Sequence, residues 1–351
     1  MSDKNQNKFK IDRHQNDEKE IWNAYVNNHP QGSFFHLAEW AELISDVFSH
    51  NIHYLTAKDR ESDDIVGVLP LVEQKSILFG HCLVSTPFCV YGGALSNGDS
   101  IREALENEAL EIGKRIGVDY VELRYRHPVE NENFERFCHH STFGWHIEDG
   151  RDGVLSQIKK KQRANVRQSL KNGLDCRFSQ DTKVAYDIYS ESVRNLGTPV
   201  FHSSYFPKLV EYFGDKIGVL TVLSDNKAVS SVLSFYFKGE VLPYYGGGTS
   251  AARGLKSNDR MYYELMCHAQ DNGFAKFDFG RSKDNSGAFK YKTTWGMKAE
   301  PLHYIRALVN ATEHPNLSPN NPKYSLVINT WKKLPLWVSR AIGPFLSRYL
   351  G

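Results

Sequence analysis

A segment late in the chain gathers side chains that could hold an anionic group. Asp278, Arg281 and Lys292 follow the apolar run at Phe277 and Phe279, and glycine and aromatic residues separate them. A strand that exits into glycine and then presents a carboxylate and cations beside aromatic rings is typical of a ligand-binding loop. These residue types favour an anionic ligand or a developing negative charge held by cations. An Asp278–Arg281 ion pair that braces the loop is the structural alternative.

A second group of cations lies between the two halves of the chain. Residues 155–173 are predicted to form one helix that ends at Gly173, and no acidic residue occurs from 154 to 174. Spacings of three and four place four basic residues on one helical face: Lys160, Arg163, Arg167 and Lys171. This face is either simply solvated or binds a phosphate-bearing ligand that relieves the mutual repulsion.

Composition and missing motifs exclude several classes of function. Among 351 residues, 43 Lys and Arg balance 41 Asp and Glu, so any binding of polyanions must be local. The P-loop, the dinucleotide-binding glycine motif and the hydrolase nucleophile motif are absent from the sequence. Five scattered cysteines without a Cys-x-x-Cys pair favour a reducing cytoplasm, and no metal site is expected. We expect neither a signal peptide nor a membrane-spanning helix.

The elements that must position these side chains occur twice, in the same order. Helices are predicted at 18–28 and 36–48, where Trp40 falls on an apolar face. Paired strands at 52–57 and 65–72 are followed by a break at Tyr91–Gly93, a helix at 99–117 and a strand at 120–124. The second half repeats this order with strands at 217–223 and 229–237, a break at Tyr245–Gly247, a helix at 257–272 and a strand at 276–279. This repetition predicts an internal duplication, with two similar α+β domains whose mixed sheets face a shared cleft.

The C-terminal tail has its own composition. A turn-rich linker at 316–322 precedes a basic amphipathic stretch at 331–350, and no acidic residue follows Glu313. Pro335 and Pro344 should kink any helix in this stretch. It either docks on the protein's own surface or contacts an anionic membrane.

Several motifs together resemble the FemAB-like family, in particular the branch associated with exosortase and exopolysaccharide loci. The closing motif runs from Asp278 through Gly280, Arg281, Ser282 and Gly287 to Lys292, Trp295 and Gly296. Further matching stretches are Phe35-His36 with Trp40, Gly67–Leu71, Phe79-Gly80, Leu83–Ser85, Pro87-Phe88, Tyr91–Gly93, Glu122–Arg124 and Leu196–Pro199. The resemblance implies two tandem GNAT-like domains.

The resemblance also implies an activity and a set of site residues. FemAB-type enzymes move an aminoacyl group from aminoacyl-tRNA to an amine on a cell-wall precursor, and related GNAT proteins use acyl-CoA. The family's catalytic lysine matches Lys292, preceded here by Tyr291 where the family usually has Phe. The sequence has no match to the separate helical-hairpin arm of some family members, nor to the loop motif that binds acyl-CoA. The resemblance therefore does not determine whether the acyl donor is acyl-CoA or aminoacyl-tRNA. The candidate substrate-binding residues are the four cations of residues 160–171 together with His36, Trp40, Tyr91, Arg124, Tyr245, Tyr291 and Trp295.

The sequence thus predicts an acyltransferase that acts on a cell-envelope or exopolysaccharide precursor without a covalent enzyme intermediate. The expected regions are a polar tail at 1–20, GNAT-like domains at 21–150 and 151–310, and a linker with a tail at 311–351. Expected partners are a phosphate-bearing glycan or peptidoglycan-type precursor, the acceptor end of a tRNA, and an anionic membrane contacted by 331–350. No tightly bound cofactor is expected, and the location would be cytoplasmic, peripheral on the inner face of the membrane. The alternative is a non-catalytic module that binds a glycan precursor.

Overall fold

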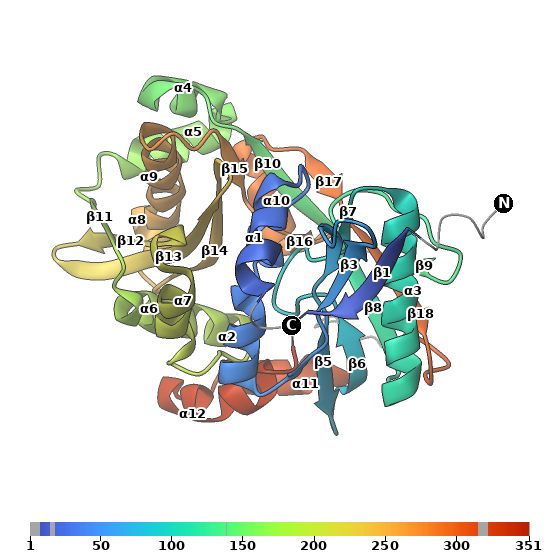
Figure 1. The fold of residues 1–351 in the computed structure, drawn as a ribbon. Coiled ribbons are helices and arrows are strands. Elements are labelled where there is room, and N and C mark those ends of the chain that lie inside the picture. The colour runs from blue at the N-terminus through green and yellow to red at the C-terminus, as the bar shows by residue number, and fades with distance from the viewer. Residues whose placement is uncertain (1–7, 15–17, 138, 315–321, 351) are drawn as a thin grey trace. The chain divides into compact units, whose positions relative to one another are not determined.

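The computed structural model describes residues 8–14, 18–137, 139–314 and 322–350, with the side chains of 322–325 excepted. The chain forms two compact units (Figure 1). Unit 1 comprises Met1–His139, Pro301–Leu317 and Tyr349–Gly351, and unit 2 comprises His140–Glu300 and Ser318–Arg348. The linker expected at 316–322 lies outside the described residues except for its last position.

Unit 1 contains two sheets with helices α1 (Lys19–Asn28), α2 (Glu39–Phe48) and α3 (Asp99–Ile116) and the short 3₁₀ helix Phe34–His36. The first sheet is antiparallel, in the order β1 (Phe9–Arg13), β3 (Leu55–Asp59), β4 (Ile65–Leu69) and β7 (Leu95–Ser96). The second has the order β2 (Asn51–Ile52), β5 (Val72–Ser76), β6 (Gly80–Val84), β8 (Tyr120–Tyr125), β18 (His303–Leu308) and β9 (Glu135–Arg136). Its β6–β8 pair is parallel.

Unit 2 is built on one mixed sheet. Its order is β11 (Asp175–Ser179), β12 (Ile217–Ser224), β13 (Lys227–Phe237), β14 (Glu240–Gly248), β15 (Lys276–Asp278), β10 (His140–His146) and β16 (Ser282–Lys283), with β17 (Ala299–Pro301) beside β10. The β14–β15 pair is parallel. The helices are α4 (Gly150–Gln157), α5 (Lys160–Ser169), α6 (Thr182–Leu196), α7 (Tyr205–Phe213), α8 (Ala252–Leu255), α9 (Ser257–Asp271), α10 (Gly287–Trp295), α11 (Pro322–Trp331) and α12 (Leu336–Ser347), with a 3₁₀ turn at Gly214–Lys216.

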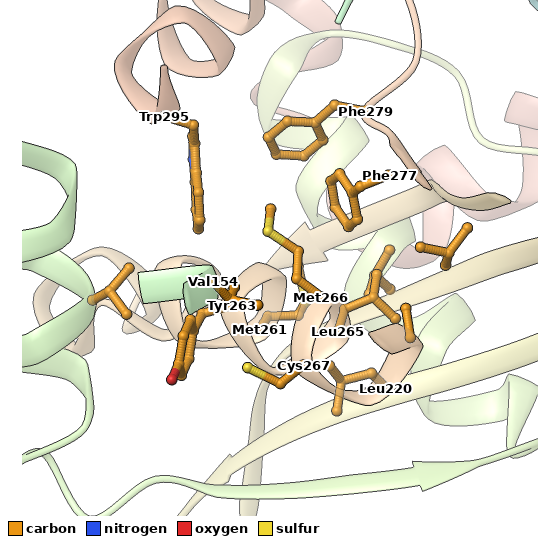
Figure 2. Close-up of a cluster of buried hydrophobic side chains, with 14 of the residues drawn as sticks. Val154, Leu220, Met261, Tyr263, Leu265, Met266, Cys267, Phe277, Phe279 and Trp295 are labelled. Atoms are coloured by element: carbon orange, nitrogen blue, oxygen red, sulfur yellow. The ribbon is translucent and has the colours of Figure 1, made fainter. Parts of the chain in front are cut away.

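The core of unit 2 explains why α9 and α10 hold their positions. Met261, Leu265 and Met266 of α9 recur at helical spacing and pack against Phe277 of β15, and Trp295 at the end of α10 is fully buried in the same cluster. Figure 2 shows these side chains, together with Phe279, gathered between α9 and the sheet. Burial of such large apolar side chains fixes the loop that follows Asp278 and carries Arg281, and it fixes helix α10, which carries Lys292.

The two units repeat one order of elements, which confirms the predicted fold of two tandem GNAT-like α+β domains with mixed sheets. In unit 1 the hairpin β3–β4, the neighbouring β7, helix α3 and strand β8 follow one another; in unit 2 the corresponding elements are β12–β13, β14, α9 and β15. The strand antiparallel to β8 is β18, and the strand antiparallel to β15 is β10. Strand β18 therefore joins unit 1 from beyond the sequence of unit 2, whereas β10 lies at the start of the stretch 140–300 that forms the sheet of unit 2.

The chain passes from unit 1 to unit 2 at residue 140 and returns to unit 1 at residue 301, whereas the sequence predicts domain boundaries after residues 150 and 310. Residues expected within a polar N-terminal tail include β1, which pairs with β3 because Phe9 and Ile11 alternate onto the apolar core of unit 1.

Two sequence-based expectations are wrong in detail. Residues 155–173 form parts of two helices, α4 and α5, and not one, because the chain is extended at Ile158 and Lys159. Tyr245–Gly247 lies inside strand β14 and is not a break before a helix. The glycines there serve close packing: a Cβ on Gly247 would lie 2.7 Å from Cβ of Ser192 in α6.

Candidate active site

Asp278 anchors the turn that leaves β15. Its side chain is fully buried, and Oδ1 accepts hydrogen bonds from Thr142 Oγ1 of β10 at 3.1 Å and from the backbone N–H of Gly280 at 2.8 Å. Gly280 has a φ of +70°, a conformation that favours glycine. The Asp278 carboxylate therefore shapes the loop, and the loop turns back toward α10.

Lys292 lies on α10 and reaches back to this loop. The helix begins after Ser286, whose Oγ accepts a hydrogen bond from the N–H of Phe289 at 3.1 Å. Lys292 Nζ donates to the carbonyl oxygens of Gly280 at 2.9 Å and Arg281 at 3.0 Å. An ammonium group has three N–H donors, and these two carbonyls are its hydrogen-bond acceptors among the described residues. One donor is left for a ligand.

The surroundings of Lys292 are apolar enough to change its ionisation. Its Nζ lies 5.4 Å from the ring centre of Phe279 and 5.7 Å from that of Phe143. Burial lowers the pKa of Lys292 from the usual 10.5 to about 8; the charge of Asp278 opposes this shift and that of Arg281 adds to it. The group is thus largely a cation at neutral pH and loses its charge just above that range.

A buried polar network that sequence reasoning missed holds α5, α9 and α10 together. Asp259 Oδ1 on α9 accepts hydrogen bonds from Gln162 Nε2 on α5 at 2.6 Å and from the hydroxyl of Tyr291 on α10 at 3.0 Å. Burial raises the pKa of Asp259. The only signal in the sequence was an acidic residue on the otherwise apolar face of a predicted helix. Tyr291 is expected from the sequence to bind substrate, but its hydroxyl donates to Asp259 in this network.

Trp295 joins α10 to the start of α5 through its backbone. Its carbonyl oxygen accepts a hydrogen bond from the N–H of Lys159 at 2.9 Å, and the carbonyl of Thr293 accepts one from Lys159 Nζ at 3.3 Å. At the other end of α5, Asn172 Nδ2 donates to the carbonyl of Leu255 at 2.9 Å. Helix α5 therefore runs from α10 to the connection between β14 and α9.

The four cations predicted to share a face of α5 divide into two groups. Lys160, Arg167 and Lys171 are exposed. Arg163 instead caps the end of α4, since its Nε donates to the carbonyl of Ile158 at 3.0 Å and its guanidinium also reaches the carbonyl of Ser156. Two of these exposed cations thus lie on α5 and Lys171 lies just after its end, and Arg253 is a further exposed cation on α8, close in sequence to Leu255.

Tyr245 lies elsewhere in unit 2, in an aromatic cluster. Its hydroxyl is 2.9 Å from that of Tyr205, and its ring contacts those of Tyr189, Phe201 and Phe206. Burial is the main reason why its pKa lies well above the usual 10.

The remaining predicted residues belong to unit 1 and are buried: His36, Trp40, Tyr91 and Arg124. His36 Nε2 lies 2.9 Å from the carbonyl oxygen of Gly93, and Trp40 Nε1 donates to the carbonyl of Phe34 at 3.0 Å. Arg124 Nε donates to Glu122 at 2.9 Å. Arg126 stacks on the ring of Tyr91. Each side chain thus has a partner within unit 1. In unit 2, Asp278 and Lys292 both bind the loop that carries Arg281, whereas Tyr291 binds Asp259 and Trp295 packs in the core.

Unit 2 also contains a cavity of about 450 Å³, and the residues that line it are distant in sequence from Asp278, Arg281 and Lys292. Its walls come from α6, from the start of α7 with the residues before it, and from Arg340 of α12. Within the described ranges, no three His, Cys, Asp or Glu side chains are grouped so that they could hold a metal ion. In the same part of the chain, no helix is long and apolar enough to cross a membrane.

Comparisons with known proteins agree with this architecture. Residues 160–293 match the family model described as an acetyltransferase (GNAT) domain. A search of curated proteins found no match. Among solved structures, FemX is similar with a TM-score of 0.65 at 15% identity, covering 91% of this chain and 100% of that one.

Two further solved structures resemble this chain. L-PGS from Bacillus licheniformis has a TM-score of 0.52 at 14% identity and covers 92% of this chain and 96% of that one. A tandem GNAT protein from the clavulanic acid biosynthesis pathway has a TM-score of 0.50 at 11% identity and covers 87% of this chain and 100% of that one. At these identities the likeness establishes the fold. Together with the family match at 160–293, it identifies a GNAT acetyltransferase domain in unit 2 and a tandem GNAT fold for the chain.

Proposed function

We propose that this protein transfers an acyl or aminoacyl group to an amine or hydroxyl of a phosphate-bearing cell-envelope precursor. The nitrogen or oxygen of the acceptor attacks the carbonyl carbon of the donor, the bond to the donor's leaving group breaks, and the acceptor's proton leaves with that group or with water. No covalent bond to the enzyme is needed, since the protein positions the two substrates and stabilises the charge that develops.

The observation that carries this proposal is the environment of Lys292. Two carbonyl oxygens hold its ammonium in place, and a third N–H is left over. A fixed cationic donor in apolar surroundings is what a developing oxyanion requires. Asp278 supports this role indirectly, because its hydrogen bond to Gly280 shapes the loop whose carbonyls bind Lys292. Arg281 follows in the same loop and adds positive charge at this position.

The exposed cations of α5 support a donor or acceptor that carries phosphate. Lys160 follows Lys159, which donates hydrogen bonds to the carbonyls of Trp295 and Thr293. Lys171 precedes Asn172, which donates to the carbonyl of Leu255. An extended anionic ligand placed along α5 would therefore lead toward α10 and Lys292. Acyl-CoA and the acceptor end of an aminoacyl-tRNA both carry such phosphates, and we propose one of these as the donor.

We infer the acceptor class from the FemAB-like motifs and from the likeness to FemX and L-PGS. We propose a lipid- or nucleotide-linked glycan or peptidoglycan-type precursor, of the kind made for exopolysaccharide or cell wall. Such an acceptor would be met at the inner face of the cytoplasmic membrane, in agreement with the peripheral location expected from the sequence.

The test is a transfer assay with the purified full chain. Radiolabelled acetyl-CoA and a mixture of radiolabelled aminoacyl-tRNAs would each be incubated with cell-envelope extract, and labelled products would be separated by chromatography. We expect label from one donor class to enter the envelope fraction. The Lys292→Met variant should lower turnover by about 10²–10³, the loss typical for removal of one oxyanion donor.

The matched control is Lys290→Met, which removes an exposed lysine from the same helix. It should leave turnover unchanged. Absence of transfer from both donors, with precursor still bound by the protein, would instead identify a binding module. Equal turnover of the Lys292→Met variant and the unmodified protein would remove Lys292 from the mechanism.

A further inference from the structure

The two faces of helix α12 differ sharply in size and exposure. Ser339, Gly343 and Ser347 are buried and lie four residues apart, so they form one stripe along the helix. Trp337 and Phe345 lie eight residues apart on the opposite stripe, and they are 73% and 72% exposed. A helix that buries its smallest residues and exposes its largest aromatic ones is the reverse of an ordinary packed helix.

The small stripe docks α12 onto unit 2. Arg340 Nε donates to Ser190 Oγ of α6 at 2.9 Å, and its guanidinium forms an ion pair with Asp187 at 2.9 Å. A Cβ on Gly343 would lie 2.8 Å from the carbonyl oxygen of Val200, so only glycine permits this approach. Figure 1 shows α12 running beside α6. Docking on the protein and exposure of the aromatic stripe therefore occur together.

The charged residues that the tail itself contributes around this stripe are all basic, and Asp187 of α6, an acidic residue beside α12, is paired with Arg340. No acidic residue follows Glu313, and Lys332 and Lys333 are exposed in the turn before α12. Among the described residues, neither lysine has an ion-pair partner. Ile342 adds to the exposed apolar surface of α12, and Leu326 and Val327 of α11 are exposed as well. Aromatic and aliphatic side chains flanked by lysines match the interface of a bilayer with anionic headgroups.

We propose that α12 is an interfacial helix that lies on an anionic phospholipid bilayer, with Trp337 and Phe345 entering the headgroup region while Ser339, Gly343 and Ser347 stay docked on unit 2. This goes beyond the acyl transfer proposed above and does not depend on it. Because the helix is held by Arg340 and by Gly343, the contact orients unit 2 on the membrane and does not merely tether it.

The test is co-sedimentation of the full chain with vesicles of phosphatidylcholine alone and of phosphatidylcholine with phosphatidylglycerol. We expect binding to the anionic vesicles only. The Trp337→Ser/Phe345→Ser variant should lower the partition coefficient by on the order of tenfold or more, since it removes both aromatic anchors. The Lys332→Gln/Lys333→Gln variant should lower it by roughly tenfold and weaken its salt dependence.

The matched control is Ile77→Ser/Leu78→Ser, in the turn between β5 and β6. These residues are 104% and 73% exposed, so the variant removes a comparable apolar surface from unit 1. It should bind vesicles as the unmodified protein does. A Trp337→Phe variant should still bind, but should lose the part of the tryptophan emission that brominated lipids quench.

Three results would overturn the proposal. One is failure of the unmodified protein to bind anionic vesicles. Another is an equal loss of binding in the control variant and in the Trp337→Ser/Phe345→Ser variant, which would indicate general adsorption. The third is a dimer in solution that the Trp337→Ser/Phe345→Ser variant dissociates, because the stripe would then be an interface between two copies of the chain.

Discussion

At the scale of single residues, the chemistry of the site depends on how Lys292 is buried. A lysine with the usual pKa of 10.5 would stay charged at any physiological pH, whereas a pKa of about 8 makes the cation sensitive to small changes in alkalinity. A transfer reaction that needs the charged form should therefore lose rate as the pH rises through about 8. Burial thus strengthens the electrostatic effect of the group and also limits its pH range.

The lowered pKa of Lys292 also predicts how the stability of the fold depends on pH. Between about 8 and 10.5 the unfolded chain still binds the proton that folded Lys292 has released, so the free energy of unfolding should rise with pH over this window. The contribution should be about 1–3 kcal/mol, after allowance for partial exposure. Urea unfolding of the unmodified protein and of Lys292→Met at pH 7.5 and pH 10 measures it as a difference.

Lys290→Met serves as the reference for this experiment, because the exposed lysine on the same helix should leave the pH dependence unchanged. The interpretation fails if the Lys292→Met variant and the unmodified protein gain stability equally between the two pH values.

At the scale of elements, α5 shows how one basic helix divides its cations between structure and ligand. Arg163 holds the end of α4, whereas Lys160, Arg167 and Lys171 are exposed. The variant with these three changed to Gln should weaken binding of the phosphate-bearing donor by roughly tenfold to a hundredfold at low salt, and should flatten the salt dependence. Isothermal titration calorimetry at several salt concentrations provides the measurement.

A variant with the same change in net charge, Lys183→Gln/Lys227→Gln/Lys276→Gln, places the substitutions on exposed lysines elsewhere in unit 2. It should bind the donor normally. If both triple variants lose affinity to the same degree, the effect belongs to net charge, and α5 is only a solvated face. Arg163 is left intact in both, since its loss would also free the carbonyls that it caps.

Helix α12 makes a separate prediction about packing. Gly343→Ala should lower the free energy of unfolding of the docked tail by about 1–3 kcal/mol, because the added methyl group overlaps the backbone of Val200. Limited proteolysis should then cleave near residue 335 sooner. Gly254→Ala, at an exposed helical glycine with no atom within 4 Å of the added Cβ, should leave stability unchanged or slightly higher. Identical cleavage of both variants would contradict the docking of α12 through Gly343.

At the scale of the whole molecule, the pairing of β18 with β8 determines which fragments can fold. Residues 140–300 contain every strand of the sheet of unit 2 apart from the last residue of β17, and they should fold alone. Residues 1–150 lack β18, which pairs with β8 over six residues, and should not fold stably. Circular dichroism and heteronuclear NMR of the two fragments provide the test.

The matched control joins residues 1–139 to 301–317 through a short Gly-Ser linker and so restores β18 to its sheet. This fragment should recover cooperative unfolding. Stable, cooperative folding of residues 1–150 would show that β18 is dispensable and that its pairing with β8 contributes little to stability.

Much of the local structure could be predicted because its causes are local. The apolar spacing of α3 and the glycine that follows it, the charged turn between β3 and β4, and the repeated order of elements all appear in the sequence and reappear in the structure. The FemAB-like motifs also identified the tandem GNAT-like fold, and they selected Lys292 for the closing segment. These features follow from side-chain periodicity and from the conformational range of glycine.

Tertiary structure alone decided which strands lie antiparallel to β15 and β8, because β10 and β18 are each more than a hundred residues away from these partners in the sequence. The β18–β8 pair also spans the sequence of unit 2. The tertiary structure also determined which contacts single side chains make. The sequence places Arg163 on a basic face, but only the break between α4 and α5 turns it toward free carbonyls. Likewise, the amphipathic pattern of α12 predicts an apolar face, but only the contact of Gly343 with Val200 determines that the small stripe faces the protein and the aromatic stripe faces outward. Burial and pairing across long sequence distances depend on the whole fold, so a local pattern cannot specify them.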